Sequence, residues 1–352
     1  MEIYILDRDI NILGVLSTYE AIIWNTKFQE PGIFKAEFIF TEKLNSILQQ
    51  ENLLYKTDED EPAIIKRKFL KLSKDGREII QVHGYMASRY LNQRIIWTKM
   101  LLRGSPELIM REMVIEQVIE PLDPERRMKN IRLGELAGYG GNIEKQISYD
   151  NLQEALTNIA VTYELGYRLR LDIDQKLFFF EVLKGVDRTL GTDHPCIFTR
   201  DYGNVLTQEY SEDSTNYRNV CLVGGLGEDE NRVMTVVGKA AGLDRYEMFY
   251  NASGLSDKDM SSGEYTKQLG QKGFEKLAAN YAAKSFESKI NKNRAMKFAL
   301  GDYVTCMDKR WNITVNTQVK AIEKGFSKKE ESFIVTFGNG VQTLINLIKA
   351  RG

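Results

Sequence analysis

Cysteine and histidine are scarce in this chain of 352 residues. The three cysteines, Cys196, Cys221 and Cys306, lie far apart and are odd in number. This excludes a disulfide framework and offers no paired spacing for a metal site. Their neighbours are apolar, so we expect buried, inert thiols. His83, at the end of a predicted strand, is expected to be structural, and His194 has no Cys or His at ligand spacing nearby. We therefore expect no catalytic, metal or cofactor-binding residues.

Long apolar runs and an excess of either charge are also missing. No stretch approaches the roughly 18 uninterrupted apolar residues of a membrane-spanning helix, so we expect no stable membrane insertion. The acidic, strand-like start, Met1 to Asp7, does not resemble a signal peptide, and synthesis in a cytoplasm is expected. Lys and Arg number 48 against 49 Asp and Glu, without the positive excess that neutralises phosphates. Nucleic-acid binding is therefore not expected.

Familiar catalytic and phosphate-binding motifs are absent as well, including Gly-x-Ser-x-Gly, His-Glu-x-x-His and the Walker loop. Gly225-Leu226-Gly227 resembles the start of a dinucleotide fingerprint, but the third glycine position holds Glu230 and acidic neighbours would repel a pyrophosphate. We expect a tight hairpin turn there. The acidic run 58–61 lacks the glycine and spaced oxygens of a calcium loop and is expected to be a solvated loop. A pair of carboxylates for glycoside cleavage remains open, although no pattern points to one.

What the sequence does contain is strand patterns with helices between them. The N-terminal β domain is expected at 1–96, a helix-containing α+β domain at 97–195, and a C-terminal β domain with a long helix at about 262–290 at 196–352. In the first domain, short runs of strand formers are separated by turn residues, with a hairpin turn at Lys74-Asp75-Gly76-Arg77. The fold class is therefore α+β and predominantly antiparallel, and a doubly wound sheet is not indicated.

Three helices can be placed from capping signals. Ser105-Pro106-Glu107 begins the first, with Leu108, Ile115 and Ile119 on one face. Asp150 begins the second, which has a capping box with Gln153 and Gly166 as its C-cap. Ser261 and Glu264 begin the third, with Leu269, Gly273, Leu277 and Tyr281 on one stripe. Hairpins are predicted at 167–183 and 219–237, and the closing strands at 298–307, 311–315, 319–324 and 332–337.

Four ordered stretches resemble one family, the phage tail-hub or tail-associated (Tal-type, siphophage Gp37-like) proteins, which are similar in fold to the baseplate hub of contractile-tailed phages. The stretches are Ile5 to Phe38, Val82 to Ile96, Phe178 to Gly225 with the Gly-x-Asp-Arg-Thr signature at Gly185 to Thr189, and Leu300 to Thr305 with Val335 to Gly338 and Thr343-Leu344. We interpret these residues as turn and core elements. Gly185, Gly224 and Gly301 would allow close backbone approach, and Asp187 and Arg188 would form a charge pair.

The resemblance implies a structural component of a virion tail tip, made in the cytoplasm of a host bacterium, and not an enzyme. Two β-barrel-like domains per subunit, with an interposed α/β domain and a long helix, would build a homotrimeric ring that closes the tail tube. The implied partners are the distal tail protein or tail-tube ring, with the tape-measure and receptor-binding or fibre proteins as further implied partners. The chain resembles a hub core without a fibre or hydrolase module. Two alternatives stay open: a tail-tip enzyme that degrades peptidoglycan, as endopeptidase or glycosidase, and a carbohydrate-binding adsorption protein.

Overall fold

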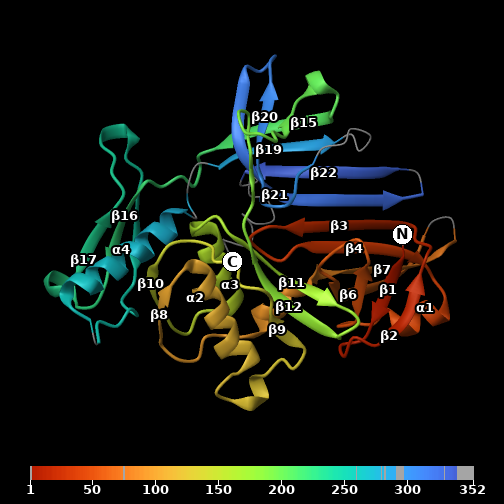
Figure 1. The fold of residues 1–352 in the computed structure, drawn as a ribbon, viewed down its shortest axis with the longest axis horizontal. Helices are drawn as coiled ribbons and strands as arrows, with labels where there is room; N and C mark the ends of the chain where they lie inside the picture. Colours follow the sequence, from red (N-terminus) through yellow and green to blue (C-terminus); the bar gives the residue numbers. More distant parts are fainter. Residues whose placement is uncertain are drawn as a thin grey trace.

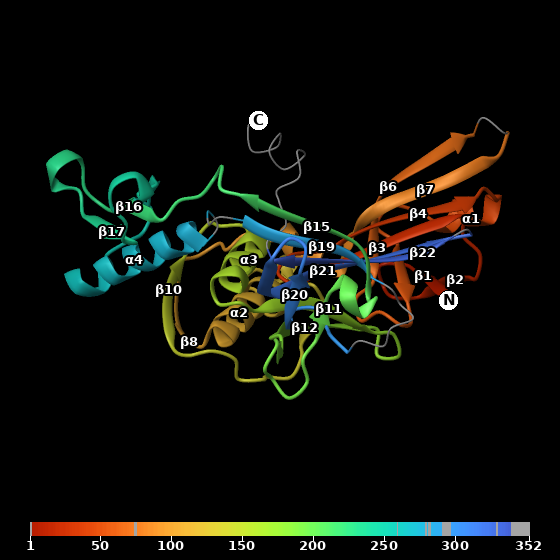
Figure 2. The ribbon, with the colours of Figure 1, turned by 90° about the horizontal axis from the view of Figure 1, so that it is seen from above.

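The computed structural model describes residues 2–73, 76–258, 260–278, 280, 283–290, 297–328 and 330–338. Within these residues antiparallel strands dominate and the α-helices are few (Figure 1). The expectation of a predominantly antiparallel β fold with interposed helices is confirmed. A small lobe lies at one end of the molecule, and the N-terminal strands lie at the other (Figures 1 and 2).

The N-terminal third consists of strands whose side chains alternate between core and solvent, as in β4, where Phe34, Ala36 and Phe38 are buried. Its elements are β1 (Ile3–Leu6), β2 (Ile12–Leu16), β3 (Ala21–Lys27), β4 (Ile33–Ile39), α1 (Glu42–Ile47), β5 (Leu53–Lys56), β6 (Ala63–Leu72) and β7 (Glu78–Met86). The β6–β7 hairpin projects from the body (Figure 2). In its predicted turn Gly76 has φ +79°, and Lys74 and Asp75 lie outside the described residues.

The middle third carries two helices against small sheets. Its elements are β8 (Met100–Gly104), α2 (Pro106–Val114), β9 (Ile131–Leu133), β10 (Ile143–Ile147), α3 (Leu152–Thr162), β11 (Gly166–Asp172) and β12 (Leu177–Leu183). Ser105 caps α2 as predicted, because its Oγ accepts from Leu108 N at 3.2 Å. Asn151, one residue after the predicted start, caps α3 through Glu154 N at 3.3 Å. The β11–β12 hairpin is confirmed.

Two details of these helices were predicted wrongly. Leu108 is 46% exposed, whereas Met110, Met113 and Val114 of α2 are fully buried. The predicted stripe ran into the π-helical turn at Ile115–Ile119, where the number of residues per turn changes and a fixed period fails. Gly166 does not cap α3 but begins β11. The absence of a side chain at Gly166 lets the Phe28 ring pack closely against the backbone, because a Cβ there would lie 2.4 Å from that ring.

The last third begins with short strands and then forms two separate sheets. Its elements are β13 (Asp187–Arg188), β14 (Ile197–Phe198), β15 (Val205–Asp213), β16 (Val220–Gly224), β17 (Met234–Val237), β18 (Glu247–Asn251), α4 (Ser262–Ala278), β19 (Ala283–Ile290), β20 (Tyr303–Asp308), β21 (Ile313–Ser327) and β22 (Glu331–Gly338). The predicted strands 311–315 and 319–324 are parts of the single strand β21. Thr343 and Leu344 lie outside the described residues.

The long helix predicted at about 262–290 is wrong in its second half. Ser261 and Glu264 form the predicted capping box, with Ser261 N donating to Glu264 Oε2 at 2.8 Å and Glu264 N to Ser261 Oγ at 3.3 Å. The helix ends at Ala278, and residues 283–290 form β19. The reason is a change of period: Phe286, Ser288 and Ile290 are buried, with Glu287 and Lys289 between them more accessible, which is the two-residue repeat of a strand. Tyr281 lies outside the described residues.

The largest sheet joins the two ends of the chain. Its main path runs β15-β19-β22-β21-β3-β4-β7-β6-β5-β1-β2, and β21 pairs antiparallel with β3 from Ala321↔Lys27 to Ser327↔Ala21. The lobe at the other end is the sheet β17-β16-β18 covered by α4. The described strands of the large sheet form an open path from β15 to β2, so the structure does not display two separate closed barrels.

Candidate structural site joining distant motifs

The Gly-x-Asp-Arg-Thr signature lies against the loop that contains Gly301 and Asp302. Asp302 is 2% exposed. Its Oδ1 accepts from Val186 N at 2.8 Å, and its Oδ2 accepts from Arg188 Nε at 2.8 Å and from Ala299 N at 2.9 Å. Two motifs more than a hundred residues apart therefore meet at one buried carboxylate, which binds both a guanidinium and two backbone amides.

The predicted charge pair between Asp187 and Arg188 is wrong. Arg188 pairs with Asp302, and Asp187 accepts from Thr189 N at 2.9 Å and Thr189 Oγ1 at 2.8 Å. Neighbouring residues of a strand point to opposite faces, so these two side chains cannot share a face in β13. The bonds from Thr189 lower the pKa of Asp187.

Glycines allow the two motifs to approach each other at backbone distance. A Cβ on Gly185 would lie 1.7 Å from the Gly301 carbonyl oxygen, so no side chain fits there. Gly301 has φ +94°, and a Cβ on it would lie 2.3 Å from the Phe28 ring. The close approach expected of Gly185 and Gly301 is thus observed. At Gly224 a Cβ would meet the Arg232 guanidinium at 2.7 Å.

Phe28 connects all three parts of the chain. Its fully buried ring lies between Gly166 of β11 and Gly301. Its backbone N–H donates to Lys320 O of β21 at 2.9 Å, and its carbonyl accepts from Tyr167 N at 3.2 Å. One aromatic side chain therefore packs against the middle and last thirds from a position just after β3. Nothing in the sequence around Phe28 indicated this role, because the partners come from distant segments.

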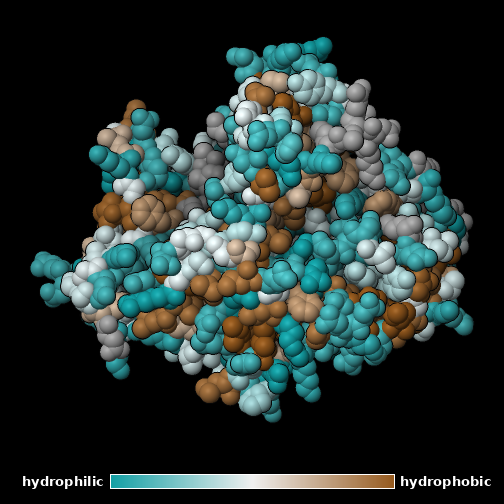
Figure 3. Space-filling view, in the orientation of Figure 1, coloured by the Kyte–Doolittle hydropathy of each residue, from teal (hydrophilic) through white to brown (hydrophobic). Residues whose placement is uncertain are grey.

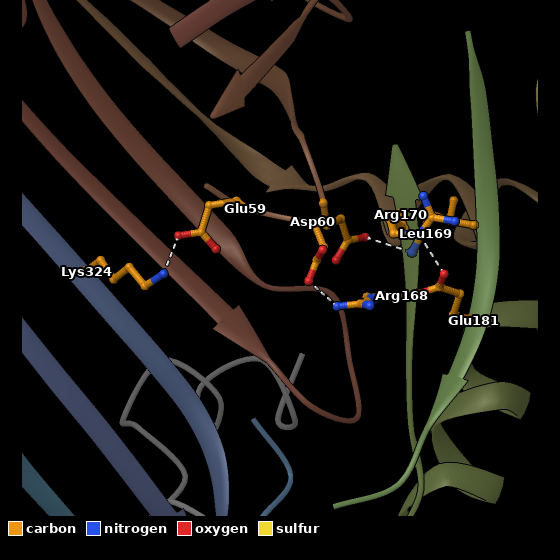
Figure 4. Close-up of polar contacts among 8 residues, drawn as sticks. Glu59, Asp60, Arg168, Leu169, Arg170, Glu181 and Lys324 are labelled. Carbon is orange, nitrogen blue, oxygen red and sulfur yellow. Dashed lines mark hydrogen bonds and ion pairs between the residues drawn. The ribbon is translucent and has the colours of Figure 1, made fainter. Parts of the chain in front are cut away.

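The acidic run 58–61 is a second joint and not merely the solvated loop we expected. Glu59 Oε1 accepts from Lys324 Nζ of β21 at 2.6 Å, and Asp60 forms an ion pair with Arg168 of β11 (Figure 4). The Glu61 carboxylate accepts from the backbone N–H groups of Ser88 and, at 3.4 Å, Leu169. Arg168 Nε also donates to Glu181 Oε2 at 2.8 Å (Figure 4). The loop ties the N-terminal strands to both other parts.

Burial has a clear effect on Glu61. It raises the pKa of this carboxyl to about 7, because the enclosed site disfavours the charged form. The bonds from Ser88 and Leu169 and the charge of Arg168 offset only part of that effect. The other buried joint, between Lys145 of β10 and Glu275 of α4, is an ion pair whose side chains are 2% and 8% exposed. It fastens the lobe to the middle third.

The structure does not bring the histidines and cysteines together into a site. His83 lies on β7 with its ring 5.3 Å from Phe69, and its pKa is lowered, first by burial and then by nearby Lys35 and Lys71. His194 is exposed in a loop. The three cysteines are buried free thiols, as predicted, and burial raises the pKa of Cys196 to about 11, which disfavours the reactive thiolate. Within the residues the structure describes, no three His, Cys, Asp or Glu side chains are grouped as metal ligands.

The Gly225-Leu226-Gly227 run begins the hairpin connection between β16 and β17, which is longer than the tight turn that we expected because β17 starts only at Met234. Gly225 N donates to Val233 O at 2.8 Å, and Val233 N donates to Leu226 O at 2.9 Å. Gly227 has φ +96°. The Tyr265 hydroxyl of α4 accepts from Leu226 N at 2.7 Å, so the turn is occupied by the protein's own side chain. Among the described helices, none combines the length and hydropathy that a membrane span requires.

Comparisons with known proteins agree on one group. Residues 2–339 match a family model described as Siphovirus ReqiPepy6 Gp37-like protein. No curated protein matches the chain. A tail protein from Neisseria meningitidis has a similar fold, with a TM-score of 0.59 and 11% identity over 96% of both chains.

Two further solved structures have the same fold. The 43 kDa tail protein of prophage MuSo2 from Shewanella oneidensis gives a TM-score of 0.57 at 11% identity, over 96% of this chain and 98% of that one. Prophage tail protein gp18 from Listeria monocytogenes gives 0.56 at 10% identity, over 99% and 98%. At these identities the likeness shows the fold.

Proposed function

The chain belongs to the Siphovirus ReqiPepy6 Gp37-like protein family, and from this membership we propose that it is a structural hub of a phage or prophage tail tip. The single observation that carries the proposal is the family match over nearly the whole chain. The fold shared with three tail proteins over 96–98% of their lengths, two of them from prophages, supports it. The proposed location is the tail tip of the virion.

In the proposed assembly three copies form a ring that closes the tail tube and contacts the distal tail protein. Receptor-binding or fibre proteins and the tape-measure protein are further proposed partners. The continuous sheet suits this role, because its N-terminal and C-terminal parts are held in fixed relation by β3–β21 pairing. We propose that these two parts are the barrel-like halves of each subunit. The proposed domain boundaries lie near residues 96 and 195.

The surface supports extensive contacts. Apolar side chains gather in several patches on the face seen in Figure 3, with hydrophilic side chains around them. The most exposed apolar residues include Leu72 at 75%, Leu122 at 90% and Leu243 at 97%. Apolar patches with polar surroundings are typical of surfaces that other proteins cover.

Assembly can be measured directly. The purified chain would be examined by analytical ultracentrifugation and negative-stain electron microscopy, alone and mixed with the distal tail protein of the same phage or prophage. We expect threefold rings, formed by the chain itself or on the distal tail ring. A species that stays monomeric in both conditions, at concentrations of tens of micromolar, contradicts the hub proposal.

A further inference from the structure

A surface cleft of about 390 Å³ lies in the middle third, between the segment that precedes β8 and the turn that follows α2. It belongs to none of the joints described above. Its lining is polar with one large aromatic side chain: Asn92, Gln93, Arg94, Ile95, Trp97, Asp123, Glu125 and Arg126. This volume is within the range of small-ligand pockets and is large enough for one or two sugar rings.

The walls of the cleft are fixed by hydrogen bonds. Arg126 Nη2 donates to Ile95 O at 2.6 Å and to Gln117 Oε1 at 3.1 Å. Arg94 Nε donates to Arg126 O at 2.9 Å, so each wall holds the other. Trp97 N donates to the same Gln117 oxygen at 3.4 Å. The cleft therefore exists before any ligand arrives, which reduces the entropy lost on binding.

Trp97 presents an accessible aromatic surface at this cleft. Trp97 is 47% exposed, and the Arg126 guanidinium lies 4.2 Å from the centroid of its indole ring. The guanidinium orders the indole by a cation–π contact. An exposed tryptophan held in one orientation offers a flat apolar surface to the C–H face of a ligand ring.

The charges of the lining balance. Arg94 and Arg126 supply donors, and Asp123 and Glu125 supply acceptors. Among the described residues neither arginine forms an ion pair with a carboxylate. The pKa of Arg94 is lowered, first by burial and then by the charge of Arg126. Two arginines disfavour a cation, two carboxylates disfavour an anion, and the polar lining disfavours an apolar ligand.

We propose that this cleft binds a neutral saccharide. Each sugar hydroxyl both donates and accepts hydrogen bonds, so it suits a lining that mixes guanidinium and carboxylate groups. One sugar ring would stack on the Trp97 face that the Arg126 guanidinium does not cover, with hydroxyls bound by Arg94 and Asp123. This function is additional to the hub role, because a ring can assemble whether or not the cleft is occupied.

The test is a calorimetric titration of the purified full chain with chitotetraose, maltotetraose and a rhamnose tetrasaccharide, with inorganic tripolyphosphate as an anionic probe. We expect saturable binding of at least one saccharide and none of tripolyphosphate. Trp97→Ala is expected to weaken that binding at least tenfold, and Asp123→Asn to weaken it severalfold. Trp311→Ala is the matched control, because Trp311 is 43% exposed and also lies near an arginine, Arg200, at 5.3 Å.

Several results would overturn the proposal: binding of none of the three saccharides, binding of tripolyphosphate that Trp97→Ala abolishes, or equal losses in Trp97→Ala and Trp311→Ala. Circular dichroism of each variant establishes that it is folded. If Trp97→Ala fails to fold, two other measurements test the proposal. Asp123→Asn should still weaken saccharide binding, and saccharide addition to the wild type should shift the indole N–H resonance of Trp97. A chain that assembles into rings but binds no saccharide contradicts this inference alone.

Discussion

Single residues in this chain take their roles from partners that are far away in sequence. Asp187 and Asp302 are both carboxylates in the motifs that resemble the family, yet only Asp302 is buried. It is bound by Arg188 and by two backbone N–H groups. The signature is therefore a packing motif whose central residue lies outside it, at Asp302.

Replacement of Asp302 by alanine is expected to lower the unfolding free energy by about 3 kcal/mol. The change leaves Arg188 and the buried N–H groups of Val186 and Ala299 without their acceptor. Urea unfolding followed by circular dichroism measures the effect. Asp187→Ala is the matched control and should change stability little, because that side chain is exposed and, among the described residues, accepts its hydrogen bonds from the adjacent Thr189. Equal losses in the two variants would refute the assignment.

Glu61 should make stability depend on pH. The pKa of its carboxyl is about 7 in the folded chain, against an ordinary value of 4.5. The folded state therefore binds this proton more tightly than the unfolded state. The resulting stabilisation is complete below pH of about 4.5 and is lost as pH rises to about 7, a difference of about 3 kcal/mol.

The measurement compares urea unfolding at pH 5 and pH 7.5 for the wild type and Glu61→Gln. Glutamine keeps an acceptor for the Ser88 and Leu169 N–H groups but does not titrate. The wild type should lose more stability between the two pH values than the variant does. Parallel changes in both proteins would show that Glu61 is not the titrating group.

At the scale of elements, Gly270 and Gly273 of helix α4 lie in opposite environments. A Cβ on Gly270 would meet nothing within 4 Å, whereas a Cβ on Gly273 would lie 2.7 Å from methyl carbons of Val223 and Val237. Gly270→Ala should stabilise the chain by about 0.5–1 kcal/mol through helix propensity. Gly273→Ala should destabilise it, because α4 must move away from β16 and β17. Thermal unfolding of the two variants gives opposite shifts, and shifts of the same sign would contradict this packing.

Elements with one strong local signal could be predicted from the sequence. Ser105 and the Ser261–Glu264 box begin their helices, and the alternating residues of β11 and β12 form the expected hairpin. The end of α4 could not be placed, because local signals begin a helix more clearly than they end one, and β19 is a strand through pairing with β15 and β22. Long-range contacts decided the rest. Nothing in the local sequence of Asp302, Phe28 or Glu59 indicates the distant segment that each one contacts.

At the scale of the whole molecule, direct contacts connect the three parts of the chain to one another. The β3–β21 pairing joins the first and last thirds, and the acidic loop joins the first third to both others. Phe28 lies where all three meet. Because these contacts cross every expected domain boundary, we expect the parts built on the large sheet to lose structure together and not one by one.

Phe28→Ala tests this expectation. Removing a fully buried aromatic ring typically costs about 3–5 kcal/mol, and here the cavity borders Gly166 of β11 and Gly301, next to the backbone hydrogen bond from Phe28 to Lys320 of β21. Hydrogen exchange read by mass spectrometry should therefore show reduced protection in β4, β11 and β21 by similar amounts. Phe69→Ala is the control, because Phe69 is 40% exposed on the projecting β6–β7 hairpin and its loss should alter exchange there alone. If Phe28→Ala weakens β4 while β21 keeps its protection, the sheet is not one cooperative unit, and the proposed rigid subunit must be replaced by hinged halves.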